Sequence, residues 1–217
     1  MQLHLVRHPK PTISGNAFDI CYGRSDLPVS AHENARVQNR LIETLLKPAL
    51  LFSSPLRRCA GLAGGLANEP GWPVPILDSR LLELDFGSWE MQSWQSISRD
   101  EIDAWAAAMI DYQPGGGESV MQMAARVQAF YLDLLRLRVV PPHHHNPDDV
   151  VVICHAGTIR LLLACHALTT VSAEAGSSVY VAKIAGIADI ADIADIAHRA
   201  ASEPHRIGYG EVVSLSL

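Results

Sequence analysis

Short apolar runs alternate with helical patterns along most of this chain, and this alternation limits the folds it can adopt. Strands that alternate with helices usually form a mainly parallel sheet with helices packed on both faces. The sequence therefore predicts an α/β protein with a three-layer α/β/α architecture. The strand-like runs are LHLV at 3–6, ALLF at 49–52, VPIL at 74–77, DVVVIC at 149–154 and EVVSLSL at 211–217.

The helices between these runs have start signals, because certain side chains cap the unpaired N–H groups of a first helical turn. A further helix is predicted for residues 157–168, which continues the alternation in the second half of the chain. The start signals are the S-x-x-E capping box of Ser30 and Glu33, the cap and N1 proline formed by Ser54 and Pro55, and Glu118–Ser119 ahead of a long apolar stripe.

Length and composition fit one globular domain over residues 1–217. Of these 217 residues, 48% are hydrophobic, which is enough for one sizeable core. A helical excursion is expected near residues 90–115. The segment 184–198 is a low-complexity repeat of Ile, Ala and Asp with Ile at every third position, which drifts around a helix by about 60° per step. It predicts a slightly sticky helix or a disordered excursion rather than a catalytic element, with a partner-binding helix as the alternative.

The charge balance argues against several classes of partner. The formal net charge is −6, whereas nucleic-acid-binding proteins usually carry a basic excess on at least one face. No stretch approaches the ~20 apolar residues of a membrane span, and the N-terminus lacks the pattern of a secretory leader. We therefore expect a cytoplasmic protein that binds neither nucleic acid nor membranes. Its oligomeric state is not predicted.

Neither the cysteines nor the histidine run predicts a metal site. The four cysteines lack CxxC pairing, and three lie inside apolar patterns, as small buried thiols do. His143–His145 lie between prolines and predict an exposed loop with at most adventitious metal binding. The cysteines are Cys21, Cys59, Cys154 and Cys165.

Polar side chains follow four of the predicted strands, where ligands of open α/β sheets bind. Any one of them alone is more often an ordinary solvated or hydrogen-bonded group, but four together indicate a site. Arginines argue against a metal centre, because fixed guanidinium groups repel a divalent cation. The side chains are Arg7 and His8 after the first run, Arg57 and Arg58 after the second, Glu83 shortly after the third and His155 after the fourth.

Arginine next to histidine points instead to a phosphoryl group. Guanidinium forks match phosphate oxygens, and the helix start at Gly157 and Thr158 is expected to add backbone donors. Neighbouring positive charge lowers the pKa of an imidazole, which keeps the ring neutral with a lone pair free to attack phosphorus. Glu83 is available to protonate the leaving alkoxide. These groups suffice for hydrolysis of a phosphate ester with no metal and no cofactor.

Five motifs in the chain resemble those of the histidine phosphatase superfamily, also called phosphoglycerate-mutase-like. They occur in the family's order over residues 3–160, and YGEVVSLSL resembles the family's closing strand. The motifs are LVRHPKP at 5–11, SSPLRRCAGLA at 53–63, LLELDFGSWE at 81–90, PGGGES at 114–119 and ICHAGTIR at 153–160.

This resemblance implies a role for each candidate residue. His8 is the nucleophile that forms a phosphohistidine, and Glu83 is the proton donor. Arg7, Arg58 and His155 form the phosphate pocket, with His155 also counted as catalytic. Arg58, rather than Arg57, fits the S-x-L-x-R register that begins at Ser54.

Within the superfamily, ICYGRSDLPVS at 20–30 is similar to a segment of α-ribazole phosphatases. This makes a small phosphorylated metabolite the expected partner, with α-ribazole 5′-phosphate as the candidate. Pro9 and Pro11 stand where the family often has Gly and Thr, and Met91 replaces a common Gly. A phosphoglycerate mutase and a non-catalytic protein that binds phosphorylated ligands are the alternatives.

Overall fold

The structure is a computed structural model, and it describes residues 1–13, 19–46, 48, 50–137, 149–174, 190–202 and 207–217. Its strands are β1 Gln2–Arg7, β2 Leu50–Ser53, β3 Ile76–Leu77, β4 Asp149–Cys154 and β5 Val212–Ser216. Its α-helices are α1 Ala31–Thr44, α2 Arg57–Ala67, α3 Arg99–Ala107, α4 Val120–Leu137, α5 Ala156–Glu174 and α7 Ile190–Ser202. Short 3-10 turns lie at Ser79–Leu81, Gly87–Trp89 and Pro114–Gly116.

The five strands form one sheet in the order β3-β2-β4-β1-β5. β1 and β2 both pair with β4 in parallel, and β3 pairs with β2 in parallel. Only β5, at one edge, runs antiparallel to its neighbour β1. The predicted mainly parallel α/β sheet is therefore confirmed, and the carboxyl ends of β1, β2 and β4 meet at the same edge.

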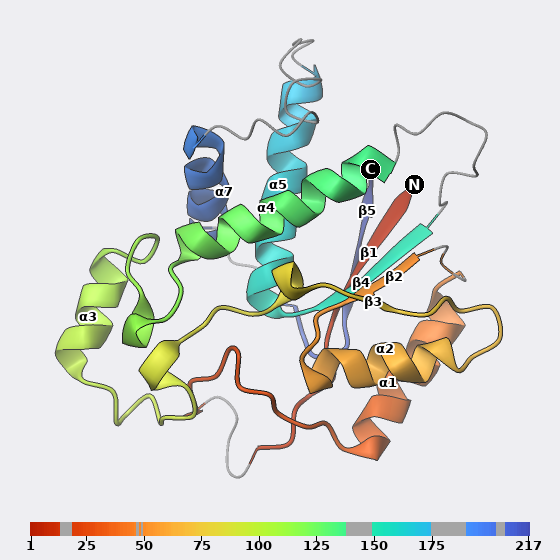
Figure 1. The fold of residues 1–217 in the computed structure, drawn as a ribbon, viewed down its shortest axis with the longest axis horizontal. Coiled ribbons are helices and arrows are strands. Elements are labelled where there is room, and N and C mark those ends of the chain that lie inside the picture. The colour runs from red at the N-terminus through yellow and green to blue at the C-terminus, as the bar shows by residue number, and fades with distance from the viewer. Residues whose placement is uncertain (14–18, 47, 49, 138–148, 175–189, 203–206) are drawn as a thin grey trace.

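Helices cover both faces of this sheet, as Figure 1 shows. β4 alternates: Val150 and Val152 pack into the core beneath α4, α5 and α7, whereas Val151 and Ile153 pack into the core beneath α1 and α2. A strand buried on both faces reads as a continuous apolar run, which is the pattern of DVVVIC. The predicted three-layer α/β/α architecture is confirmed.

Of the predicted helix starts, one was wrong. Ser30 is the N-cap of α1, and its Oγ accepts the N–H of Glu33 at 3.2 Å. The cap predicted at Ser54 does not form, because α2 begins two residues later, with Leu56 at its N-cap position. The Ser54 hydroxyl bonds the ring of His155 at 2.8 Å, and its oxygen accepts the N–H of Leu56 only at 3.5 Å.

The strand predicted at 74–77 is shorter than expected. Only Ile76 and Leu77 pair with β2, and both side chains are exposed. Pro75 has no N–H to donate to a neighbouring strand, and β3 lies at the edge of the sheet, where it has a neighbour on one side only. The hydrogen bonds available to residues 74 and 75 are therefore too few to extend the strand. Beyond it the chain leaves the sheet, and α3 lies away from the strands (Figure 1). Ile102 and Trp105 of α3 pack in a separate small cluster around Trp89.

The described part of the Ile-Ala-Asp repeat is helical. α7 begins at Ile190, and its side chains at Ile196, Ala197 and Ala200 are buried against α4 and α5. Residues 184–189 of the repeat, and His143–His145, lie outside the described residues. Among the helices that the structure describes, none is long and apolar enough to cross a membrane.

Candidate active site

Two histidines lie side by side where β1 and β4 end. Arg7 and Cys154 are register partners in the parallel pair, so the next residues, His8 and His155, leave the sheet at the same level. Their ring centroids are 5.1 Å apart, and both side chains are buried. Parallel pairing thus brings together residues separated by more than half the chain.

The carbonyl of Pro9 fixes the tautomer of His8. His8 Nδ1 lies 2.7 Å from the Pro9 oxygen, and because a carbonyl can only accept, Nδ1 carries the proton. In the neutral ring Nε2 then holds the lone pair. The proline lacks an N–H, but its carbonyl orients the ring.

His155 has the opposite tautomer. Arg58 donates from Nε to His155 Nδ1 at 3.2 Å, and since a guanidinium only donates, the proton of the neutral ring is on Nε2. Nε2 lies 2.8 Å from Ser54 Oγ and donates a hydrogen bond to it. The two histidines are therefore held in different, defined orientations.

Arg58 is buried at the centre of this group, with 1% of its surface exposed. Its two terminal nitrogens donate to the carbonyls of Ser25, at 2.7 Å, and of Gly23. Within the described residues Arg58 has no carboxylate partner. A buried cation is costly unless it is paired, so Arg58 favours an anionic ligand. Arg57, by contrast, is exposed.

Burial and charge keep both imidazoles neutral. Desolvation, and then the nearby guanidinium of Arg58, lower the pKa of His8 well below the usual 6.5. The same two causes, in the same order, lower the pKa of His155. The lowered pKa agrees in direction with the sequence prediction, but burial, and not the neighbouring arginine, is its larger cause.

Two tyrosines complete the walls of the site, and neither was predicted from the sequence. The Arg7 guanidinium lies 4.0 Å from the ring centroid of Tyr209, and it donates to the Ile207 carbonyl at 2.6 Å. The Tyr209 hydroxyl is 2.7 Å from that of Tyr22, and burial is the main cause that raises the Tyr22 pKa. Both tyrosines sit in quoted motifs, but aromatic positions in loops carry no periodic signal.

Glu83 reaches the site from the segment after β3. Its Oε1 accepts the N–H of Leu84 and its Oε2 accepts the N–H of Gly157, each at 3.0 Å. A Cβ at Gly157 would collide with this carboxylate, which explains glycine there. The expectation that Gly157 offers its N–H to phosphate is therefore wrong, because Glu83 already accepts it. The Thr158 hydroxyl donates to the backbone carbonyls of Leu81 and Leu82.

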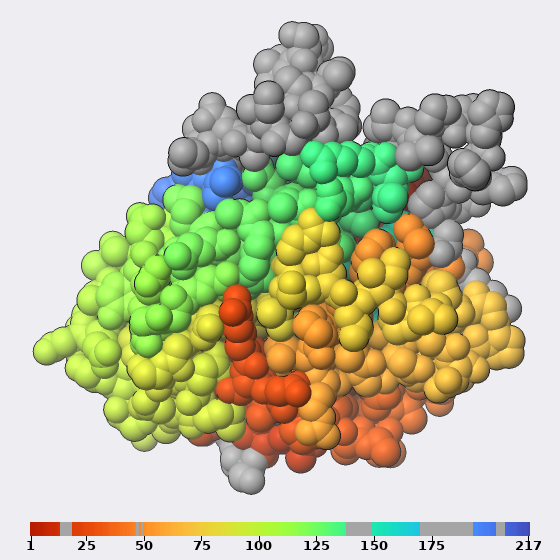
Figure 2. All heavy atoms as spheres, in the orientation of Figure 1, coloured from red at the N-terminus to blue at the C-terminus, as the bar shows by residue number. Residues whose placement is uncertain are grey.

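Glu90 holds the loop that in turn holds Arg58. Its carboxylate accepts the N–H groups of Gly23, Arg24, Ser25 and Phe86, and the Ser25 hydroxyl. Burial opposes ionisation, but these donors outweigh it and lower the pKa of Glu90. In Figure 2 the red segment before α1 lies against the yellow segment that contains residues 80–90. Sequence reasoning missed Glu90 because nothing before folding shows which N–H groups lack partners.

A largely apolar pocket of about 320 Å³ opens beside Glu83. Tyr22 and Arg160 also line it. Among the described residues no group of three or more His, Cys, Asp or Glu side chains is placed to hold a metal ion. The apolar wall consists of Leu84, Phe86, Trp105, Met109, Val120, Met123, Leu161, Ala200 and Ala201.

Comparison with known proteins agrees with this geometry. The family model of the histidine phosphatase superfamily (branch 1) matches residues 3–184. The chain belongs to the histidine phosphatase superfamily. All of the predicted site residues lie inside the matched range.

Relatives within the superfamily carry different activities. The adenosylcobalamin/alpha-ribazole phosphatase of Escherichia coli is 28% identical over 170 residues, which cover 76% of this chain and 78% of that protein. A protein named "Probable phosphoglycerate mutase GpmB", from Enterobacter, is 33% identical over 143 residues, which cover 63% and 64%. Among solved structures, the mycobacterial glucosyl-3-phosphoglycerate phosphatase has a TM-score of 0.63 at 28% identity, over 75% of this chain and 77% of that chain.

Proposed function

We propose that this histidine phosphatase superfamily member is a metal-independent phosphomonoester hydrolase that acts through a phosphohistidine at His8. The observation that carries the proposal is the buried Arg58, which lacks a carboxylate partner among the described residues and lies beside two neutral histidines. A phosphate dianion supplies the missing negative charge, and guanidinium N–H groups match its oxygens.

The first half-reaction transfers phosphate to the enzyme. The Nε2 lone pair of His8 attacks phosphorus as the bond from phosphorus to the ester oxygen breaks, and the Glu83 carboxyl group donates its proton to the departing oxygen. His8 Nδ1–H continues to donate to the Pro9 carbonyl, whose oxygen stabilises the positive charge that develops on the ring. Arg7, Arg58 and His155 surround the transferred group.

The second half-reaction releases phosphate. The Glu83 carboxylate takes a proton from water, the water oxygen attacks phosphorus, and the bond to Nε2 breaks. Inorganic phosphate leaves and both residues return to their starting protonation states. No step requires a metal ion or cofactor.

The pocket beside Glu83 favours an alcohol with an apolar ring. The departing oxygen must lie next to the Glu83 carboxyl group, so the rest of the alcohol extends into the space lined by Phe86, Trp105 and Met123. α-Ribazole 5′-phosphate, whose base is a flat apolar ring, is therefore the proposed substrate. Arg160 lines the same pocket, and a guanidinium group can pair with a carboxylate. A carboxylate-bearing substrate such as phosphoglycerate is therefore the second candidate.

A substrate assay tests the proposal. Purified protein is incubated with α-ribazole 5′-phosphate and with 3-phosphoglycerate, each with and without EDTA, and phosphate release and isomerisation are measured. We expect release from the first ester that survives EDTA. Isomerisation without release would indicate a mutase, tight binding with neither would indicate a non-catalytic protein, and activity lost to EDTA and restored by a divalent ion would exclude this mechanism.

A further inference from the structure

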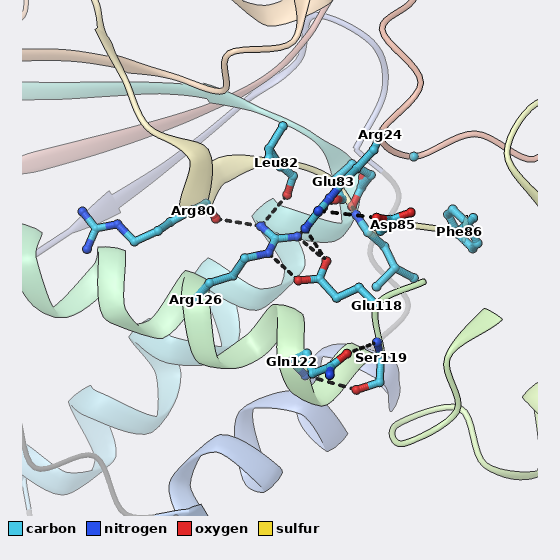
Figure 3. A network of polar contacts seen from close by, with 12 residues as sticks. Arg24, Arg80, Leu82, Glu83, Asp85, Phe86, Glu118, Ser119, Gln122 and Arg126 are labelled. Carbon is cyan, nitrogen blue, oxygen red and sulfur yellow. Dashed lines mark hydrogen bonds and ion pairs between the residues drawn. The ribbon is translucent and has the colours of Figure 1, made fainter. Parts of the chain in front are cut away.

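We propose that Arg126 is a positioning residue that sets the location of Glu83 through the main chain. The inference rests on the proposed role of Glu83 as proton donor. Arg126 lies on α4, and Figure 3 shows its guanidinium pointing at the backbone of the segment that carries Glu83. The guanidinium donates to the main-chain carbonyl of Glu83 and not to its side-chain carboxylate.

All five guanidinium N–H groups of Arg126 have acceptors. Nη1 donates to the carbonyls of Arg80, at 2.8 Å, and Leu82, at 2.7 Å. Nη2 donates to the carbonyl of Glu83 at 3.1 Å and to Glu118 at 2.7 Å, and Nε donates to the other Glu118 oxygen at 2.7 Å. A planar fork with five donors makes this pattern, whereas an ammonium group has only three. The arrangement is thus specific for arginine.

The ion pair that anchors Arg126 is largely shielded from water. The side chains of Arg126 and Glu118 are 16% and 12% exposed, and both Glu118 oxygens accept from the guanidinium. Low exposure and paired contacts hold the guanidinium in one orientation. The carbonyls of Arg80, Leu82 and Glu83 are then held in place relative to α4.

A second helix holds the same segment from the other side. On α5, the Thr158 hydroxyl donates to the carbonyls of Leu81 and Leu82, while the Gly157 N–H donates to the Glu83 carboxylate. Arg126 therefore contributes the contact at the Glu83 carbonyl itself, one residue beyond those that Thr158 reaches. Loss of that contact frees the backbone of Glu83 while α5 still holds the preceding turn.

The network also connects the proton donor to the arginine of the phosphate site. Arg24 lies 3.2 Å from Glu118 and 3.4 Å from Asp85. Arg24 belongs to the loop whose carbonyls at Gly23 and Ser25 accept from Arg58, and its backbone N–H donates to Glu90. Figure 3 shows Arg24 and Arg126 both reaching Glu118. The distance between phosphate and proton donor is thus set by one connected set of contacts.

Arg126→Lys tests this role with two substrates of matched size. For an alkyl phosphate, whose alkoxide needs a proton, we expect kcat to fall by ~10–10²-fold, because a small displacement of a catalytic group has effects of that order. For an aryl phosphate with a good leaving group the fall should stay below about 3-fold. Arg136→Lys, an exposed arginine on the same helix, is the matched control and should change neither rate.

A double variant separates positioning from general loss of structure. In the Glu83→Gln background, Arg126→Lys should cause no further loss with the alkyl ester, because the proton donor is already absent. Glu118→Gln keeps the side-chain shape and should likewise lower kcat on the alkyl ester but not on the aryl ester. If circular dichroism shows that Arg126→Lys does not fold, Glu118→Gln serves as the test instead. Equal losses on both esters, or additive losses in the double variant, would overturn the inference.

The controls also distinguish this inference from the proposed function. If the wild-type protein releases phosphate from neither ester, the proposed function fails. If Glu83→Gln selectively impairs the alkyl ester but neither Arg126→Lys nor Glu118→Gln does, only the role of Arg126 is wrong.

Discussion

The proton on His8 Nδ1 shows how a single carbonyl directs the proposed chemistry. Pro9 has no backbone N–H to offer to the site, yet its oxygen accepts from Nδ1 at 2.7 Å and leaves Nε2 as the nucleophilic atom. Proline therefore preserves the contact that the mechanism needs.

Met91, at another departure from the family pattern, has φ of 65°, a conformation that favours glycine, and its side chain is exposed.

The neutral histidines make stability depend on pH. Both have pKa values below 6.5 in the folded chain, so below pH 6.5 the unfolded chain binds protons that the folded chain does not. The free energy of unfolding should fall as pH drops from 7 to 5.5, with a slope of up to about 1.4 kcal/mol per pH unit for each histidine. Urea unfolding in phosphate-free buffer, repeated across this pH range, measures the change in the free energy of unfolding.

His8→Gln is the comparison for this prediction. It removes one of the two titrating rings, so its stability should change less steeply over the same pH range. A slope equal to that of the wild-type chain, or stability that increases on acidification, would show that His8 is not neutral in the folded protein.

Glu83→Gln tests the proton donor. An amide cannot supply the proton, so turnover of an alkyl phosphate should fall by ~10²-fold or more, and turnover of an aryl phosphate should fall much less. Steady-state kcat on the two esters measures the difference. Equal losses on both substrates would remove Glu83 from the role of acid.

The sequence predicted the charged residues of the site but not those that support them. Arg58 could be preferred to Arg57 because its place in a motif was visible in the sequence. Glu90 and Arg126 act on backbone groups that come together only in the folded chain. The same reason explains the wrong prediction for Gly157, since its N–H is accepted by a carboxylate 74 residues away in the sequence.

At the scale of elements, the loop at residues 23–25 has no regular structure of its own and depends on Glu90. That carboxylate accepts four N–H groups and one hydroxyl, whereas a glutamine amide has a single acceptor oxygen. The loop carbonyls in turn fix Arg58. Order in this loop is therefore a condition for order in the site.

Glu90→Gln should consequently affect both stability and phosphate binding. Hydrogen bonds to charged groups contribute about 1.5–3 kcal/mol, so we expect destabilisation of at least that size in urea unfolding. KM for the phosphate ester should rise several-fold, with little change in the ratio of alkyl to aryl turnover. Glu43→Gln, on the exposed face of α1, is the control. An unchanged KM would mean that the loop does not position Arg58.

Among the elements, those with strong apolar patterns were predicted best. β1, β2, β4, α1 and α4 lie close to their expected positions. The edge strand β3 and the start of α2 differ, because edge pairing and capping depend on neighbours rather than on local sequence. α7 shows the same dependence: a repeat of three residues drifts around a helix, yet Ile196 and Ala197 are buried, and Ala200 and Ala201, just beyond the repeat, line the pocket beside Glu83.

For the whole molecule, the parallel sheet explains why distant motifs form one site. β4 lies between β1 and β2, so the residues that follow these strands converge at one edge of the sheet. The order of strands and helices along the chain was sufficient to predict this. The aromatic cluster around α3 and the pocket it borders depend on side-chain packing, which an order of elements does not specify. That the chain forms a single domain stays a prediction.

The central claim is that His8, and not His155, carries the phosphoryl group. Rapid acid quench during turnover of a ³²P-labelled phosphate ester, followed by peptide mapping, identifies the labelled histidine. We predict acid-labile label on the His8 peptide only. His8→Ala should lose this label entirely, and His155→Ala should form it ~10²–10³-fold more slowly, because a group that stabilises the transition state is removed. Label on the His155 peptide, or label that persists in His8→Ala, would contradict the account.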